Sequence, residues 1–277
     1  MSMKSIKSKI TGMLMCASLL MCGCVESYEY EAAPLSGEGN AFIVGNAVTT
    51  LGFKPGDALT FSVTIQRPDS SEAGTVHLST TSKIVTLPEG INFAKGEKSK
   101  TVTLSFQSQE ATTDTVKISV APADASNYGV TSATYILKHY KVRHVDYVSG
   151  WFEKTWNNLE ILEAGNGNFS LSIPLNDANN NAFLPIEIVK HTDGKVFVRP
   201  QDVYASRSNK GDVLMLRVVG NWTGDASRLY NDADLANAST YAGNYNANDD
   251  AFELNFAWYA PNYGWWGWNE EKLYFLD

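Results

Sequence analysis

Cysteine is nearly absent from this chain. Its three cysteines, Cys16, Cys22 and Cys24, all lie in the first 24 residues. The remainder therefore cannot form an internal disulfide or bind a metal through thiolates. This excludes thiol redox chemistry and zinc–thiolate sites for the folded part.

Basic residues are also scarce. Beyond residue 24 the chain has 19 Lys and Arg against 30 Asp and Glu, a net charge of −11. A strongly acidic body repels phosphate backbones and anionic lipid head groups. We therefore expect no nucleic-acid partner, and no attachment to a membrane through a basic patch.

Motifs for catalysis are missing as well. The four histidines, His77, His139, His144 and His191, do not have the spacing of zinc ligands. The sequence has no Gly-x-Ser-x-Gly elbow, phosphate-binding loop or dinucleotide fingerprint. We expect no enzymatic activity, no metal site and no cofactor.

The N-terminus is predicted to be a signal peptide. Lys4, Lys7 and Lys9 form a positive segment, and a mostly apolar stretch follows over residues 10–21. A bilayer-spanning helix needs about 20 residues, so this stretch is too short to span. Its length is typical of the apolar region of a secretory signal.

The segment Leu20-Met21-Cys22-Gly23-Cys24 resembles the lipobox of bacterial lipoproteins. The resemblance implies lipidation at Cys24, because the small Gly23 precedes it, whereas Met21 precedes Cys22. A plain secretory signal with incidental cysteines is the alternative. We expect residues 1–23 to be the signal peptide and residues 24–35 a lipidated acidic linker.

Residues 25–31, Val-Glu-Ser-Tyr-Glu-Tyr-Glu, resemble the acidic export tag of Bacteroidetes outer-membrane lipoproteins. This resemblance implies a protein anchored in the outer membrane by its lipid alone and exposed at the cell surface. An acidic linker that is simply solvated is the alternative.

Residues 36–139 are predicted to form a β-sandwich. Apolar and polar residues alternate over 59–65, 101–106 and 116–120, and turn signals such as Lys54-Pro55-Gly56-Asp57 separate the runs. A period of two indicates strands with one face in a core. About seven short strands at this spacing are typical of an immunoglobulin-like sandwich.

Two stretches, residues 56–64 and 91–104, resemble strands of Calx-β domains. Calcium-binding relatives carry an acidic cluster after the second stretch, whereas residues 107–114 here contain only Glu110 and Asp114. Calcium takes six to eight oxygen ligands. We therefore favour a spacer domain over calcium-dependent adhesion.

After a junction at residues 140–146, residues 147–277 are predicted to form a second, aromatic-rich β-sandwich or barrel. Short alternating runs continue, for example at 169–173, and residues 232–242 are expected to hold one helical turn. The starting Gly-x-aromatic and the aromatic last hairpin resemble the C-terminal modules of outer-membrane glycan-utilisation lipoproteins. The predicted class is all-β, with two antiparallel β-sandwich-like domains in tandem.

All seven tryptophans follow residue 150, and three lie in the segment Trp265-Trp266-Gly267-Trp268. On an unbroken strand Trp266 and Trp268 share one face and Trp265 the other, so at least one large ring is exposed. Exposed aromatic surface often marks an interaction site. The candidate ligand-binding residues are Trp265, Trp266, Trp268, Tyr263, Tyr259 and Asn262.

Sugars present C–H faces that stack on aromatic rings and hydroxyl groups that need polar partners. The sequence therefore favours a non-catalytic, lipid-anchored surface protein that binds an oligo- or polysaccharide. The alternatives are a packing role for the aromatic residues, or a structural or adhesive lipoprotein that binds a surface protein partner.

Overall fold

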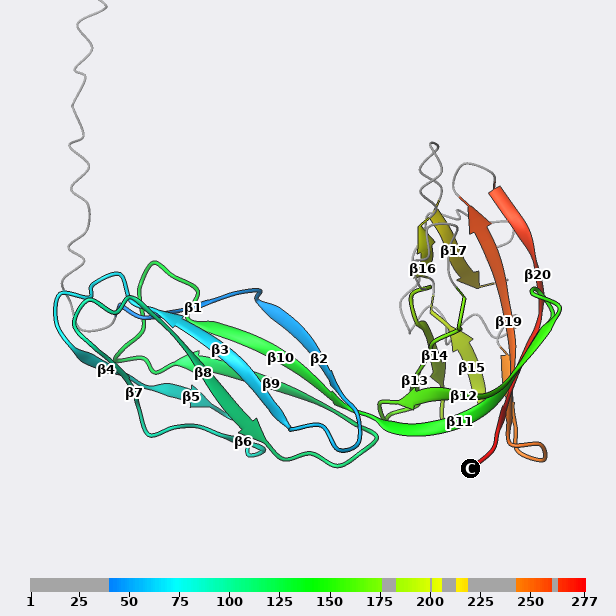
Figure 1. Cartoon of the computed structure of the whole chain (residues 1–277), viewed down its shortest axis with the longest axis horizontal. Helices are drawn as coiled ribbons and strands as arrows, with labels where there is room; N and C mark the ends of the chain where they lie inside the picture. The colour runs from blue at the N-terminus through cyan, green and yellow to red at the C-terminus, as the bar shows by residue number, and fades with distance from the viewer. Residues whose placement is uncertain (1–39, 176–182, 200, 206–212, 219–242, 261–263) are drawn as a thin grey trace, which may run out of the picture. The chain divides into compact units, whose positions relative to one another are not determined.

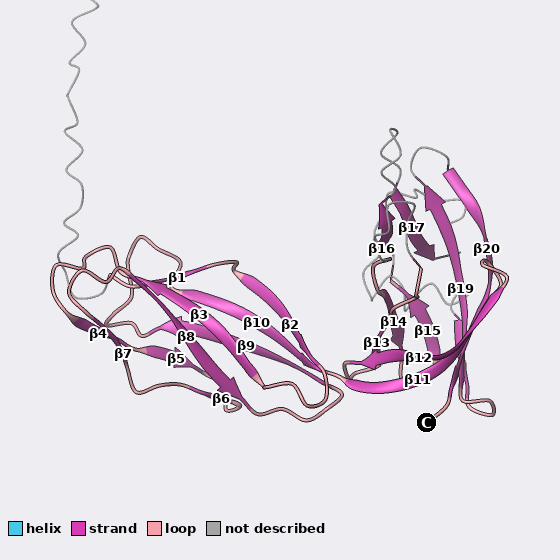
Figure 2. Cartoon of the chain, viewed as in Figure 1, coloured by secondary structure: helices cyan, strands magenta, loops and turns pink. Residues whose placement is uncertain are grey.

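The structure is a computed structural model that describes residues 40–175, 183–199, 201–205, 213–218, 243–260 and 264–277. Every element in these ranges is a β-strand (Figure 2). The predicted all-β class is confirmed. Within the same ranges no helix of the length and hydropathy required to cross a membrane occurs.

Residues 40–139 form the N-terminal sheets, which are two four-stranded sheets and one two-stranded sheet (Figure 1). The first four-stranded sheet contains, in spatial order, β1 (Phe42–Val44), β3 (Thr60–Gln66), β8 (Ser99–Phe106) and β6 (Val85–Thr86). The second contains β2 (Val48–Phe53), β10 (Ser132–His139), β9 (Thr112–Val120) and β5 (Leu78–Thr80). The small sheet pairs β4 (Gly74–Val76) with β7 (Ile91–Phe93).

The alternation in the sequence explains the core of these sheets. Along β3 the buried residues are Phe61, Val63 and Ile65, and the residues between them are exposed or half-buried. Strands β8 and β9 add Leu104 and Val116 to the same hydrophobic cluster. One face of each sheet therefore supplies the core, as the period of two predicts.

One pairing departs from the antiparallel prediction. Strand β1 pairs with β3, but β2 then pairs in parallel with β10 in the other sheet. The change of sheet occurs just after β1, at Gly45, whose φ of 133° is outside the range that L side chains favour. A short strand that crosses between sheets keeps its direction, so it can meet β10 in parallel.

The rest of the described chain forms one ten-stranded sheet. Its first half is a run of antiparallel neighbours: β11 (Lys141–Ser149), β12 (Lys154–Glu163), β13 (Asn168–Leu171), β14 (Ile186–Lys190) and β15 (Lys195–Val198). The others are β16 (Gln201–Ala205), β17 (Val213–Val218), β18 (Gly243–Asn246), β19 (Ala251–Ala260) and β20 (Gly264–Phe275).

This sheet closes on itself. β15 pairs with β18, β18 with β19, β19 with β20, and β20 with β11, which completes a ring (Figure 1). The hairpin β16–β17 lies outside the ring and pairs with the second half of β19, beyond the part that β18 covers. We call this element the closed sheet.

The closed sheet has its own hydrophobic cluster. Buried residues on every strand from β11 to β15, and on β19 and β20, contribute to it. Phe252 packs edge-on against Phe169 and Phe275, with ring centroids 5.1 and 4.8 Å apart. Since strands all around the ring contribute to one cluster, the cluster fills the interior of the closed sheet.

Residues 141–146, expected to lie in a junction, belong to β11, so only Tyr140 separates β10 from β11. The reason is that Val145 is fully buried and pairs with both β12 and β20. The two hydrophobic clusters share no residue, while Glu38–Asp277 forms one compact unit. The division into two domains therefore stays a prediction.

Candidate functional site

Four of the six predicted ligand-binding residues lie on β19 and β20. Tyr259 belongs to β19, and all three tryptophans of the segment 265–268 belong to β20. Asn262, Tyr263 and the predicted lipidation site Cys24 lie outside the described residues, as do residues 232–242.

The backbone register of this hairpin differs from the expected alternation. Tyr259 pairs with Trp265, but Trp258 pairs with Gly267, so Trp266 is an additional residue without a register partner. An extra residue of this kind is a β-bulge, which shifts the phase of the strand by one position. Trp265 and Trp268 therefore occupy positions on the same face, where an unbroken strand puts them on opposite faces.

The buried residues at the start of β19 show which face of the hairpin carries Trp265 and Trp268. Phe252 and Leu254 are buried and pair with Leu273 and Glu271, which marks the interior face. Positions between them belong to the outer face, because successive side chains of a strand alternate. The register places Ala257 opposite Trp268 on that outer face, two positions from the Asn255–Glu270 pair.

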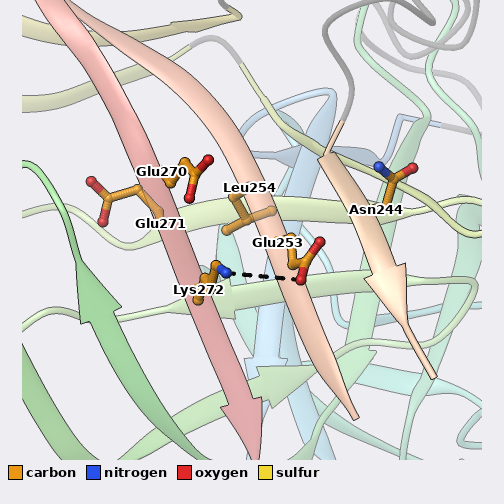
Figure 3. A pocket seen from close by; sticks show the side chains of 6 residues that line it. All are labelled: Asn244, Glu253, Leu254, Glu270, Glu271 and Lys272. Atoms are coloured by element: carbon orange, nitrogen blue, oxygen red, sulfur yellow. Dashed lines mark ion pairs between the residues drawn. The ribbon is translucent and has the colours of Figure 1, made fainter. Parts of the chain in front are cut away.

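A hollow of about 110 Å³ lies on the described part of this region. It is lined by residues of β18, β19 and β20, namely Asn244, Glu253, Leu254, Glu270, Glu271 and Lys272. Figure 3 shows Lys272 directed toward Glu253, at a distance of 3.9 Å between Nζ and Oε1, and Glu271 directed to the opposite side of β20 from Glu270. We call these outer residues, Asn244, Glu253, Glu270 and Lys272, the polar hollow.

The polar hollow depends on the close approach of β18 to β19. A Cβ atom on Gly243 would overlap the backbone oxygen of Glu253, so only glycine fits at this pairing. The next residue, Asn244, pairs with Glu253. Asn246 adds a hydrogen bond from its Nδ2 to the Asp249 carboxylate, at 2.9 Å, which organises the turn between the two strands.

Beneath the polar hollow is a buried carboxylate. Glu271 is 1 % exposed, and its Oε2 accepts a hydrogen bond of 2.7 Å from the Tyr147 hydroxyl. Its Oε1 accepts the backbone N–H of Trp151 at 3.1 Å. Burial raises the pKa of Glu271 above its usual range, and the hydrogen bonds from Ser149, Tyr147 and Trp151 oppose that rise.

The same contacts act on Tyr147. Burial, and then the negative charge of Glu271, hold the pKa of the Tyr147 hydroxyl well above its ordinary value. The phenol is therefore neutral at physiological pH and serves as a hydrogen-bond donor. Glu271 thus fixes β20 to β11 and to the turn that begins at Gly150.

Trp156 belongs to the interior rather than to a surface platform. It is 7 % exposed and stacks on Tyr147 with 5.3 Å between ring centroids. Its Nε1 is the one buried side-chain nitrogen or oxygen atom of the described residues that has no hydrogen-bond partner. Trp151 is half-buried at the turn between β11 and β12.

In residues 107–114, where calcium-binding Calx-β domains carry an acidic cluster, the Asp114 carboxylate accepts a hydrogen bond from a neighbouring hydroxyl group. Ser108 Oγ donates a 2.8 Å hydrogen bond to Asp114 Oδ2 and lies 2.6 Å from Thr112 Oγ1. Across the described ranges, no three His, Cys, Asp or Glu side chains come together in a group that could hold a metal ion.

The outer face can therefore offer two kinds of contact. The positions of Tyr259, Trp265 and Trp268 supply aromatic residues, and the polar hollow supplies carboxylate and amide groups that hydrogen-bond hydroxyls. None of the four residues of the polar hollow is among the ligand-binding residues predicted from the sequence, although Glu253 alternates with buried Phe252 and Leu254.

No protein-family model matches the chain, and no curated protein matches it. Among solved structures, the chain is similar to a multidomain protein including DUF1735 from Bacteroides ovatus. The identity is 8 %, the match covers 83 % of this chain and 89 % of that one, and the TM-score is 0.29. A likeness of this extent bears on neither activity nor partners.

Proposed function

We propose that this chain is a lipid-anchored, non-catalytic glycan-binding protein of the bacterial cell surface. Its binding face is the outer side of the β19–β20 hairpin. The observation that carries the proposal is the β-bulge at Trp266, which gives Trp265 and Trp268 positions on one face, with Tyr259 in register with Trp265. An aromatic platform needs its rings on one side of a sheet.

The polar hollow supports the same proposal. It lies on the face that carries these aromatic positions, and its carboxylate and amide groups are the partners that sugar hydroxyls require. Sugar recognition combines stacking on rings with hydrogen bonds at the ring's edge. A face with both kinds of group within one hairpin suits this ligand better than a purely apolar protein interface.

The anchor and the spacer complete the proposal. Cys24 carries the lipid, and the N-terminal sheets, which resemble Calx-β domains in sequence, serve as a spacer between the lipid and the binding face. Replacing Cys24 with Ser should move the protein from the membrane fraction to the soluble fraction of cells. Protease accessibility of intact cells then tests exposure at the surface.

The binding test uses intrinsic tryptophan fluorescence of residues 38–277, a single compact unit. Because all seven tryptophans follow residue 150, the signal reports on that part of the chain alone. We expect a saturable shift with one class of neutral plant or host polysaccharide, and its loss in Trp265→Ala. Tyr128→Ala, which removes an aromatic residue that is 81 % exposed in the N-terminal sheets, is the matched control.

Absence of a shift across a broad panel would contradict the proposal. If the chain instead retained a surface protein partner, and Trp265→Ala released that partner in the absence of any sugar, the face would be a protein interface. Both outcomes are read on variants whose thermal unfolding matches that of the parent.

A further inference from the structure

The polar hollow is too small to be a complete ligand site. Its volume of about 110 Å³ is below the roughly 300 Å³ at which small-molecule pockets begin. A ligand that enters it must therefore extend over the neighbouring surface. On this face, the pair Asn255–Glu270 is followed along the hairpin by the pair Ala257–Trp268. A ligand that extends from the polar hollow in this direction therefore reaches the aromatic positions.

The length of this face sets the size of the ligand. Successive positions on one face of a strand are about 6.8 Å apart, twice the rise per residue. Lys272 at one end and Trp268 at the other are therefore separated by about 14 Å along β20. One monosaccharide ring does not cover that distance, whereas a short oligosaccharide that lies along the strands does.

The charges of the polar hollow limit which oligosaccharide fits. Its one cation, Lys272, lies 3.9 Å from the Glu253 carboxylate, whose negative charge offsets the attraction of Lys272 for an acidic sugar. Glu270 is exposed, and no ion pair to it occurs among the described residues. The chain beyond residue 24 carries a net charge of −11, which adds long-range repulsion of anions.

We infer that the polar hollow binds the hydroxyl groups of an uncharged oligosaccharide lying along β19 and β20, and that it rejects uronate-bearing and sulfated glycans. This inference rests on the proposed glycan-binding function and adds the ligand's charge class and minimum length. The Glu270 carboxylate accepts hydrogen bonds from sugar hydroxyls, the Asn244 amide accepts and donates them, and the Glu253 carboxylate offsets the positive charge of Lys272.

The test compares each neutral polysaccharide with its own sulfated derivative. Suitable pairs are dextran with dextran sulfate, laminarin with laminarin sulfate, and xylan with its polysulfate. The protein is residues 38–277, measured by calorimetry at about 0.05 M and 0.5 M salt. We expect at least one neutral member to bind at least tenfold more tightly than its sulfated form at low salt, and its affinity to change little with salt.

Single substitutions test whether the polar hollow causes the preference for neutral glycans. Glu270→Ala should weaken neutral-glycan binding at least fivefold, and Glu270→Lys should narrow the difference between the neutral and sulfated forms. The matched control is Glu89→Ala, an exposed glutamate of the N-terminal sheets. Oligosaccharides of increasing length from the bound polysaccharide should gain affinity beyond the monosaccharide.

The outcomes separate this inference from the function on which it rests. If neutral glycans bind and Trp265→Ala abolishes binding, but Glu270→Ala and Asn244→Ala have no effect, the proposed function stands and this inference is wrong. Equal or tighter binding of sulfated glycans also overturns it. If no glycan binds at all, both the proposed function and this inference are wrong.

Discussion

The hydroxyl group of Tyr147, on β11, donates a 2.7 Å hydrogen bond to the carboxylate of Glu271, on β20, in the interior of the closed sheet. These two strands are the first and the last of the ring, so the bond joins its two ends. The carboxylate lies directly behind the face that we propose as the binding site. Its protonation and its partners therefore matter for both stability and function.

Replacing Tyr147 with Phe should lower the free energy of unfolding by about 1.5–3 kcal/mol, because a hydrogen bond to a buried charged group is lost and the ring remains. Chemical denaturation monitored by fluorescence measures this change. Tyr128→Phe, at an 81 % exposed position, should change the free energy by less than about 0.5 kcal/mol. Equal effects of the two variants would contradict the role given to the Tyr147 hydroxyl.

Glu271 should make stability fall as the pH rises. Burial raises its pKa in the folded chain above the value in the unfolded chain, so the stability it contributes is present at low pH and is lost as the pH increases through the folded pKa. The stability of Glu271→Gln relative to the parent should therefore increase between about pH 4 and pH 7. Urea unfolding at each pH measures it, and a difference in stability between the two proteins that stays constant over this range would contradict the role given to the burial of Glu271.

Leu273→Ala should destabilise the closed sheet by about 2–5 kcal/mol, since Leu273 is fully buried in the interior cluster and the truncation leaves a cavity. Leu276, three residues later, is 52 % exposed. The same substitution there should cost less than about 0.5 kcal/mol. Similar costs at the two positions would show that β20 does not line the interior as described.

Gly243→Ala should separate β18 from β19, because its new methyl group would overlap the backbone oxygen of Glu253. We expect a loss of about 1–3 kcal/mol in stability, as for other overpacked positions. Asn244→Ala alters only an exposed side chain and should leave the melting temperature unchanged. If Gly243→Ala has the same melting temperature as the parent, the close approach of β18 to β19 is not required for stability.

In the N-terminal sheets, Arg67→Lys should cost about 1–3 kcal/mol. Arg67 donates hydrogen bonds to the backbone oxygens of Glu97, Glu72 and Ala94 and lies over the Phe93 ring, and a lysine cannot reproduce this geometry. Lys95→Ala, which removes an exposed ion pair with Glu72, should cost less than about 1 kcal/mol. Differential scanning calorimetry compares the two.

The strands themselves could be predicted from the sequence. Alternation at Phe61, Val63 and Ile65 follows from a sheet with one face in a core, and β3 has this pattern. The mostly apolar run at 213–218 is likewise a strand with hydrogen-bonded neighbours on both sides. The local pattern of apolar and polar residues is sufficient to predict such strands, because each residue is buried or exposed according to its own position along the strand.

Pairing could not be predicted in the same way. The parallel contact of β2 with β10, the closure of the ring by β20 on β11, and the bulge at Trp266 all depend on residues distant in sequence or on a one-residue shift of register. A single extra residue does not disturb composition or hydropathy. It nevertheless reverses the face of Trp265 relative to Trp268. The sequence pattern alone therefore predicted opposite faces for these two residues, whereas the register puts them on the same face.

The ring closure also governs the order in which the chain can fold. Val145 pairs with Phe275, so the contact that completes the closed sheet joins residues from nearly opposite ends of the C-terminal half. The entropy of bringing distant segments together must be overcome before such a contact gives any stability. During synthesis or export, one edge of β11 therefore stays unpaired until β20 becomes available. The risk of aggregation is highest during this interval, because an unpaired strand edge can pair with another chain.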